Sequence, residues 1–260
     1  MRPDQSFKAK CLEEIQKLGE NETIAELTNS WMNAANQLKY SYHYEWQGRP
    51  IIQYPQDIVA IQELIWEVKP DLIIETGIAH GGSLIFSASM LALLDISDAI
   101  ESGSNLNPGK TKRKVLGIDI DIRAQNREAI EAHPMSSRIH MIQGSSIACS
   151  VIDQVKDIAK SYESVMVCLD SNHTHDHVLA ELKAYAPQTS VSSYCVVFDT
   201  IIEDMPADMF PSRPWSRGNN PKTAVWEYLK THPEFEIDKN IQHKLLVTVA
   251  PDGYLKRIKD

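Results

Sequence analysis

The sequence predicts an α/β fold in which helices cover both faces of a doubly wound, largely parallel sheet. Short apolar runs alternate with amphipathic segments from residue 71 to residue 199, as strands buried on both faces require. Polar or glycine residues directly follow these runs, at the strand ends where such sheets bind ligands. A length of 260 residues with 43% hydrophobic content suits one such domain with an appendage.

Two helices are expected to form an N-terminal helical appendage. Apolar residues recur at helical spacing over 7–19 and again over 22–38. The segment 40–54 that follows is rich in aromatic residues and is expected to be irregular. We therefore assign residues 1–55 to a helical appendage with an aromatic loop.

The α/β domain is expected to cover residues 56–260. It begins with a helix over 56–68 that ends before Pro70, because proline disfavours a helical residue ahead of it. Strands are then predicted over 71–75, 115–119, 139–142, 165–169 and 194–199, with helices over 81–94, 123–132, 147–159, 175–185 and 221–230. Two further apolar stretches, 235–237 and 245–249, are expected to pair as antiparallel edge strands and to complete a seven-stranded Rossmann-like sheet.

Charge and cysteine content exclude several classes of protein. A net charge of −9 and a pI near 5.5 argue against a nucleic-acid binder, which needs clustered cations; the basic run 110–114 is expected to be a solvated loop. Four widely separated cysteines indicate neither a zinc site nor a disulfide framework. No run approaches the roughly 20 apolar residues that span a bilayer, and no apolar signal region opens the chain. We expect no transmembrane segment and a cytoplasmic protein.

A glycine-bearing turn follows the first strand and is the candidate cofactor-binding loop, because glycine allows tight turns and close approach of backbone to ligand. Its spacing departs from G-x-G-x-x-G, and Asp119 lies far more than about 20 residues beyond Gly77, which argues against an NAD site. For Glu75 the alternative is a carboxylate that only orders the loop. The candidate residues are Glu75, Thr76, Gly77, Ala79, Gly81 and Ser83.

The next two strand ends carry further candidates for the cofactor. Asp119 is placed to accept hydrogen bonds from both hydroxyls of an adenosine ribose; the alternative is an N-cap of the following helix. Ser145 and Ser146 follow the third strand, where adenine contacts are made in this architecture. For these serines a helix cap is the alternative.

Two carboxylates end strands four and five. Asp170 and Asp199 are expected to converge on one crevice, where their like charges would repel unless a cation lay between them. Such oxygen ligands favour Mg²⁺, which keeps open positions for substrate hydroxyls. His173 is the candidate base that removes the hydroxyl proton. The alternative is a transition-metal site formed by His173, His175 and His177, although this stretch is expected to turn into a helix.

A polar loop with glycine and proline precedes the helix at 221–230 and is placed to close over a substrate. Trp215 offers a ring face to a sugar and Arg213 a partner to an anionic group, unless Trp215 packs on the core instead. Tyr42, Tyr44 and Trp46 either line the opposite wall or pack the appendage. The candidate substrate-binding residues are His173, His175, Glu203, Arg213 and Trp215.

Four ordered segments, LIIETGIAHGGSLIF, LDSNHTHDHVLAEL, YCVVFDTIIEDMP and RPWSRGNNPKTAVWEYL, resemble the cephalosporin hydroxylase-like family. The resemblance covers about residues 40–258, and the family is related to magnesium-dependent O-methyltransferases of antibiotic and sugar biosynthesis. It implies a seven-stranded methyltransferase sheet and S-adenosylmethionine bound by the glycine turn and by Asp119. It also implies a metal bound by Asp170 and Asp199.

The resemblance bears on the chemistry at the metal as well. Related sugar O-methyltransferases place a histidine base three residues after the first metal aspartate, which is His173 here. They have adjacent acidic residues at the end of strand five, whereas this chain has Phe198-Asp199-Thr200. The third ligand is then Thr200, Glu203 or water.

The expected function is methylation of a hydroxyl on a small-molecule or sugar acceptor, dependent on a divalent metal, by a homo-oligomeric enzyme. One alternative is a metal-dependent hydroxylase with a facial triad of His173, His175 and Asp170. The other is a non-catalytic protein that binds S-adenosylmethionine. The sequence does not identify the acceptor.

Overall fold

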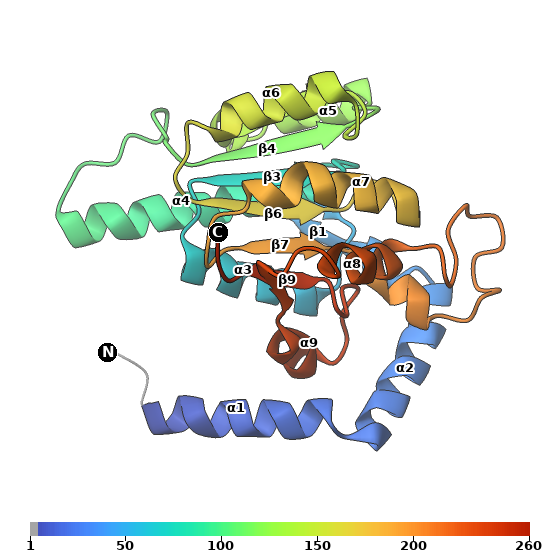
Figure 1. Ribbon diagram of the computed structural model, residues 1–260. Coiled ribbons are helices and arrows are strands. Elements are labelled where there is room, and N and C mark those ends of the chain that lie inside the picture. The colour runs from blue at the N-terminus through green and yellow to red at the C-terminus, as the bar shows by residue number, and fades with distance from the viewer. Residues whose placement is uncertain (1–4) are drawn as a thin grey trace.

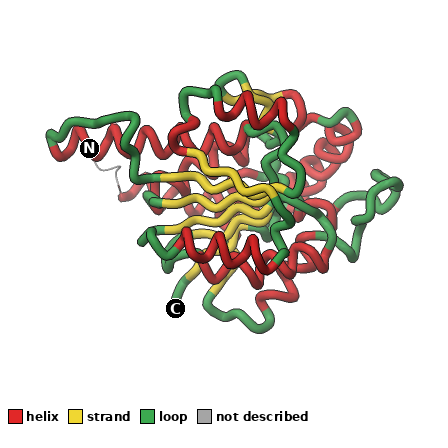
Figure 2. Tube along the Cα trace, turned by 90° about the horizontal axis from the view of Figure 1, so that it is seen from above, coloured by secondary structure: helices red, strands yellow, loops and turns green. Residues whose placement is uncertain are grey.

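Seven strands form one sheet in the order β5-β4-β3-β6-β7-β9-β8, in a computed structural model that describes residues 5–260. Their bounds are β3 Leu72–Thr76, β4 Lys114–Asp119, β5 Ile139–Gln143, β6 Val165–Leu169, β7 Tyr194–Val197, β8 Phe235–Ile237 and β9 Tyr254–Arg257. Strands β3 to β7 pair in parallel and β9 runs antiparallel to both neighbours. Figure 2 shows them side by side between helices. The predicted seven-stranded, doubly wound sheet is confirmed.

Helices cover both faces of this sheet. Their bounds are α3 Pro55–Val68, α4 Gly82–Ser102, α5 Ala124–Glu131, α6 Cys149–Ala159, α7 His175–Tyr185, α8 Pro221–Leu229 and α9 Lys239–Leu245, with the 3-10 turns η2 Ser136–Arg138, η3 Ala186–Gln188 and η4 Thr200–Asp204. Helices α3, α4 and α5 pack on one face, around strand residues such as Ile73 and Met166. Helices α6, α7 and α8 pack on the other, around Ile74 and Val167. Successive strand residues face opposite sides of the sheet. Because helices cover both sides, residues of both orientations are buried, and the central strands are continuous apolar runs.

The last strand does not lie where the sequence places it. The apolar segment 245–249 is not a strand, because α9 extends to its first residue and Leu246 has a φ of 60°. The backbone N–H of Val249 donates to Asp57 Oδ2 on α3 at 2.9 Å. The segment is apolar because it packs into the core against a helix, and β9 takes its place in the sheet.

Helix α4 continues beyond residue 94, where the sequence predicts its end. Its buried residues stop at Leu94, and the remaining turns project past the sheet (Figure 1) until Gly103, in the left-handed conformation with φ of 65°, closes the helix. By length and composition α4 is also apolar enough to cross a membrane. Its first half, however, is buried in the core against the sheet.

The appendage consists of α1 Gln5–Gly19, α2 Glu22–Gln37, the 3-10 turn η1 Tyr40–His43 and a hairpin of β1 Tyr44–Trp46 and β2 Arg49–Ile51. The hairpin replaces the expected irregular segment, and positive φ at Gln47 and Gly48 suits its two-residue turn. Helix α1 buries none of its residues and lies against α9 (Figure 1). The hairpin, by contrast, joins the core, where Trp46 Nε1 donates to Ser89 Oγ at 2.9 Å. The domain boundary at residue 55 stays a prediction.

Candidate active site

A cavity of about 560 Å³ opens at the carboxyl ends of β3 and β6. The winding of the sheet reverses between these two strands, which is where doubly wound sheets bind ligands. One side of the cavity is the glycine loop after β3. The floor is formed by residues that follow β6 and β7, and the opposite side by segments outside the sheet.

The glycines of the loop are required by neighbouring backbone. Gly77 has a φ of 90°, and a Cβ there would overlap the carbonyl oxygen of Asp170. A Cβ on Gly82 would overlap the carbonyl oxygen of Pro50 in the hairpin. The loop therefore lies in direct contact with both β6 and the appendage. Of its predicted residues, Gly77, Ala79 and Ser83 line the cavity.

Asp119, at the end of β4, lines the cavity and also holds the glycine loop. Its Oδ2 accepts hydrogen bonds from the backbone N–H groups of Ile78 at 2.8 Å and Ala79 at 3.3 Å. Its Oδ1 accepts from the backbone N–H of Asp121 at 3.0 Å. The alternative that Asp119 caps the next helix is wrong, because Arg123 is the N-cap of α5.

Two further side chains brace the same loop through its carbonyl groups. Arg49 on β2 donates to the carbonyl of His80 at 3.0 and 2.6 Å and to Asn126 Oδ1 at 3.2 Å. Asn126 on α5 in turn donates to the carbonyl of Ala79 at 2.8 Å. The brace holds Ala79 at a φ of 46°, a left-handed conformation that costs about 1–2 kcal/mol. No local sequence pattern marks Arg49 or Asn126, so neither residue is predicted.

Asp170, His173 and Asp199 meet at the floor of the cavity, as predicted. One potential ligand atom from each lies within 4.8 Å of the other two, and His173 Nδ1 is 3.2 Å from Asp199 Oδ2. Asp199 has a left-handed backbone with φ of 55° at the start of η4, a strained conformation of the kind found at functional sites. Among residues 5–260, no other group of three His, Cys, Asp or Glu side chains lies so close together.

The donors in this cluster fit a divalent cation. Burial raises the pKa of Asp170 well above its usual range, and the charge of Asp199 raises it further; a cation between the carboxylates would let both ionise. Gln53 Nε2 donates to Asp170 Oδ2 at 3.1 Å. Its Oε1 is buried without a partner in the described part of the chain. Gln53 was missed, although a glutamine within the apolar run 51–54 is a detectable signal.

The covering loop, residues 205–219, forms part of the opposite wall. Trp215 packs edge-on against His173 with ring centroids 5.8 Å apart. The guanidinium of Arg213 lies 5.9 Å from the centre of the Trp215 ring. Both residues line the cavity, as does Phe210. The alternative that Trp215 packs on the core is therefore wrong.

The appendage supplies the rest of this wall. Lys39 and Tyr42, at the end of α2 and in η1, line the cavity. Tyr44 and Trp46 instead pack against the core. The sequence allowed Tyr42, Tyr44 and Trp46 either to line the cavity or to pack the appendage. Tyr42 takes the first role, and Tyr44 and Trp46 take the second.

Two of the candidate histidines do not reach the cluster. His175 Nδ1 is 2.8 Å from Thr223 Oγ1 and its Nε2 is 3.2 Å from Glu227 Oε2, so His175 joins α7 to α8 and is not a substrate contact. His177 Nε2 is 3.1 Å from Ser146 Oγ. The structure therefore supports neither the histidine-rich transition-metal site nor a facial triad with two histidines.

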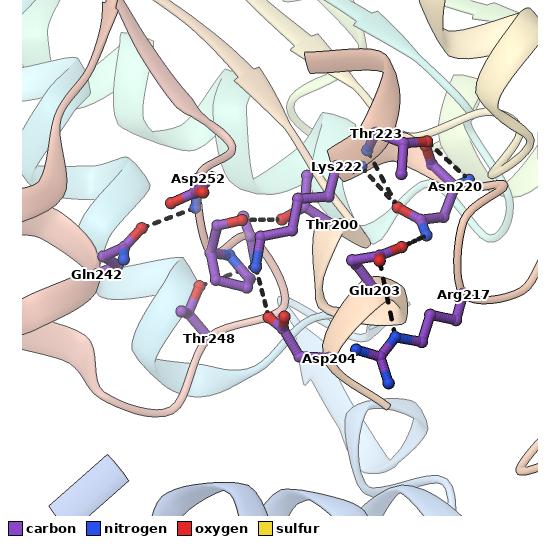
Figure 3. Close-up of polar contacts among 12 residues, drawn as sticks. Thr200, Glu203, Asp204, Arg217, Asn220, Lys222, Thr223, Gln242, Thr248 and Asp252 are labelled. Atoms are coloured by element: carbon purple, nitrogen blue, oxygen red, sulfur yellow. Dashed lines mark hydrogen bonds and ion pairs between the residues drawn. The ribbon is translucent and has the colours of Figure 1, made fainter. Parts of the chain in front are cut away.

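Thr200 and Glu203 do not line the cavity, and their side chains make polar contacts elsewhere (Figure 3). Thr200 is fully buried and donates to the carbonyl oxygen of Pro251 at 2.6 Å. Glu203 Oε2 accepts from the backbone N–H of Gly218 at 2.7 Å and from Asn220 Nδ2 at 2.5 Å. Neither side chain is available as the third metal ligand, and the substrate contact predicted for Glu203 is replaced by a bond that closes the loop.

The far end of the covering loop leads directly into α8. Asn220 caps this helix, because its Oδ1 accepts from the backbone N–H groups of Lys222 at 3.0 Å and Thr223 at 3.3 Å. The buried Lys222 pairs with Asp204 at 2.6 Å (Figure 3). The covering loop thus begins at the turn that follows Asp199 and ends on a capped helix.

Two predicted cofactor residues lie beneath the glycine loop. The carbonyl of Thr76, which is fully buried, accepts from the backbone N–H of Asp170 at 2.9 Å, so Thr76 joins β3 to β6. Glu75 is buried and accepts a hydrogen bond from the hydroxyl of Ser83. Burial raises the pKa of Glu75 to about 7. The alternative that Glu75 orders the loop is the one that the structure supports.

Three other predicted cofactor residues also lie off the cavity. Gly81 has a φ of 84°, and a Cβ there would overlap the side chain of Ile130. Ser145 and Ser146 precede α6, whose N-cap is Ala148. The serines therefore neither line the cavity nor cap the helix.

The fold and this site together define a class of enzyme. The sheet has the strand order of a methyltransferase with one antiparallel strand, and its switch point carries a glycine loop and an acidic residue after β4. Two carboxylates and a histidine face that loop. These are the features of an S-adenosylmethionine-dependent O-methyltransferase.

The chain belongs to the rhamnosyl O-methyltransferase/CmcI family, whose profile matches residues 38–258. It is 27% identical over 214 residues to rhamnosyl O-methyltransferase from Mycobacterium leprae (strain TN), and the aligned region covers 82% of each chain. It is also 27% identical over 203 residues to the protein of that name from Mycobacterium tuberculosis (strain ATCC 25618 / H37Rv), covering 77% of this chain and 73% of the relative. The predicted family and enzyme class are confirmed.

Solved structures support the fold. An apo structure of CmcI matches 84% of this chain and 78% of its own with a TM-score of 0.53 and 20% identity. A CmcI structure described with Mg and SAM matches with a TM-score of 0.52 and 19% identity. The apo structure of a TDP-rhamnose 3'-O-methyltransferase of calicheamicin biosynthesis covers 99% of this chain and 97% of its own, with a TM-score of 0.50 and 15% identity.

Proposed function

We propose that this protein transfers the methyl group of S-adenosylmethionine to a hydroxyl group of a sugar, with the help of Mg²⁺. The observation that carries the proposal is the cluster of Asp170, His173 and Asp199, which faces the glycine loop in one cavity. The relatives named rhamnosyl O-methyltransferase support a sugar acceptor. The CmcI structure with Mg and SAM supports the two cofactors.

The cofactor side of the cavity binds S-adenosylmethionine. Gly77, Ala79 and Ser83 offer a backbone that a ligand can approach closely. The carboxylate of Asp119 borders the same space and accepts hydrogen bonds from hydroxyl groups there.

The metal side activates the acceptor. Asp170 and Asp199 would hold the cation, which when bound would lower the pKa of an acceptor hydroxyl. His173 is oriented by Asp199 through Nδ1, which leaves Nε2 to accept the hydroxyl proton. Trp215, whose ring meets that of His173, gives the acceptor an apolar surface beside the base.

We further propose a homo-oligomer in the cytoplasm. Exposed large apolar side chains gather on the appendage, where contact between copies would remove them from water. The net charge of −9 suits a soluble enzyme, and four free cysteines suit a reducing compartment. On the appendage these residues are Phe7, Leu12, Leu27, Trp31 and Leu38, besides Tyr42 at the cavity.

Calorimetric titration with S-adenosylmethionine and, in parallel, with NAD⁺, each with and without Mg²⁺, tests the reaction class. We expect saturable binding of S-adenosylmethionine and none of NAD⁺. Methyl transfer to a rhamnoside should then stop in a chelator and return with Mg²⁺. Binding of NAD⁺ alone would overturn the methyltransferase proposal, and an unchanged rate in chelator would overturn the role of the metal.

A further inference from the structure

Two cations on the acceptor wall have no carboxylate partner in the described part of the chain. Lys39 follows α2 and Arg213 lies in the covering loop, so two unrelated segments place positive charge on the same cavity. Each cation rests near an aromatic ring, Lys39 Nζ at 5.9 Å from the centre of Tyr42 and Arg213 at 5.9 Å from that of Trp215. Such contacts order a cation without neutralising it.

The charges that line the cavity indicate what these cations bind. Three carboxylates border it, those of Asp119, Asp170 and Asp199, together with Lys39 and Arg213. A divalent metal and S-adenosylmethionine, which is a net monocation, balance the three carboxylates. The charges of Lys39 and Arg213 then remain. A neutral sugar leaves them uncompensated, whereas a phosphate or diphosphate group supplies the missing negative charge.

We propose that the acceptor sugar carries a phosphate or diphosphate group, and that Lys39 and Arg213 bind it. This inference rests on the proposed function and names the class of its acceptor. The planar fork of Arg213 matches two phosphate oxygens, and Lys39 acts as a point charge. The appendage thereby contributes a substrate contact, a role beyond its packing on the domain.

Binding to the complex with S-adenosylhomocysteine and Mg²⁺, which cannot turn over, tests the inference by calorimetry. The probes are dTDP-rhamnose, rhamnose 1-phosphate and methyl rhamnoside, which share a sugar and differ in charge. We expect the phosphorylated sugars to bind at least about tenfold more tightly than the neutral rhamnoside, with an affinity that falls as salt is raised. A further gain for dTDP-rhamnose over rhamnose 1-phosphate would identify a nucleotide sugar as the source of the phosphate.

Variants assign the effect to the two cations. Lys39→Gln and Arg213→Gln should each weaken dTDP-rhamnose about tenfold and leave methyl rhamnoside unchanged. Lys69→Gln is the control for Lys39, because Lys69 also has a left-handed backbone (φ 50°) and lies 5.4 Å from the centre of the Trp66 ring, away from the cavity. Arg123→Gln is the control for Arg213, because Arg123 is also exposed but lies outside the cavity.

The outcomes separate the inference from the proposed function. Equal affinities for neutral and phosphorylated sugars, or cation variants that behave like their controls, would overturn the phosphate site and leave the methyltransferase intact. Absence of S-adenosylhomocysteine binding to the unaltered protein would overturn both.

Discussion

The cofactor side and the acceptor side of the cavity are built in different ways. The glycine loop connects β3 directly to α4, and its amide and carbonyl groups are held by Asp119, Arg49 and Asn126. The acceptor side consists of the end of the appendage and the covering loop, whose two ends are tied by side chains such as Glu203. The first side directly continues a strand of the sheet, whereas the second consists of segments outside the sheet. Loops of the second kind vary without disturbing the scaffold, so the acceptor can change while the cofactor site stays the same.

The largest expected effect comes from the cluster between the two sides. Asp170→Asn removes a proposed metal ligand and should lower kcat on the order of 10³-fold while S-adenosylmethionine still binds. Asp176→Asn is the control, since Asp176 is exposed on the first turn of α7, outside the cavity. Steady-state kinetics with calorimetric cofactor binding measure both. Full turnover by the first variant would show that the cluster is not catalytic.

Two glycines with the same backbone conformation sharpen the comparison. Gly77→Ala should cost about 3 kcal/mol or more of unfolding free energy and lower cofactor affinity, because its Cβ overlaps the carbonyl oxygen of Asp170. Gly218→Ala should cost only about 1–2 kcal/mol, because φ is also positive but no heavy atom lies within 4 Å of its Cβ. Denaturant unfolding measures the difference. Equal losses would mean that backbone contact does not fix the cofactor side.

The buried carboxyl beneath the cofactor side should make stability depend on pH. Glu75 keeps its proton up to about pH 7 in the folded protein and releases it near pH 4.5 when unfolded. Between these values the unfolded state binds fewer protons, so the free energy of unfolding falls as pH rises, by about 3 kcal/mol. Glu75→Gln should lose this contribution, so its free energy of unfolding should fall less steeply with pH; the raised pKa values of Asp57 and Asp170 act in the same direction and remain. Glu128→Gln, at an exposed position on α5, should keep the full dependence. Denaturant unfolding at pH 5 and pH 8 compares them; a variant that still follows the unaltered protein would contradict the assignment to Glu75.

The smallest expected effect tests whether the two sides are independent. Glu203→Gln weakens the bonds that close the covering loop, so KM for the acceptor should rise about fivefold, equivalent to about 1 kcal/mol. Cofactor affinity should stay within about twofold. A similar loss of both affinities would show that the covering loop also supports the cofactor side.

The sequence predicts the residues at the strand ends well, because each position follows from the pattern of its immediate neighbours in the chain. Asp119, Asp170 and Asp199 each end a buried apolar run, and the carboxyl ends of parallel strands share one edge of the sheet. The glycine loop is predictable for the same reason. Asp170 and Asp199 therefore meet as expected.

The remaining site residues depend on information that is not local. Asp199 has a left-handed backbone, which turns the chain into η4. This turn determines that the side chains of Thr200 and Glu203 point away from the cavity. Gln53 and Arg49 reach the site from the appendage through tertiary packing alone. An apolar run also does not show whether it pairs with a strand or packs against a helix, so the sequence predicts a strand at 245–249 where the structure has none.

The place of β9 in the sheet sets the order in which the enzyme is completed. β9 lies between β7 and β8, although both precede it in the chain. During synthesis, one edge of β7 therefore stays unpaired until residues 254–257 have left the ribosome and can pair with it. Asp199 follows β7, and Thr200 is anchored to Pro251, so we expect Asp199 to take its final position only after residues 251–257 have joined the fold. A nascent chain in which residues 251–257 are still inside the ribosome is therefore expected to be inactive.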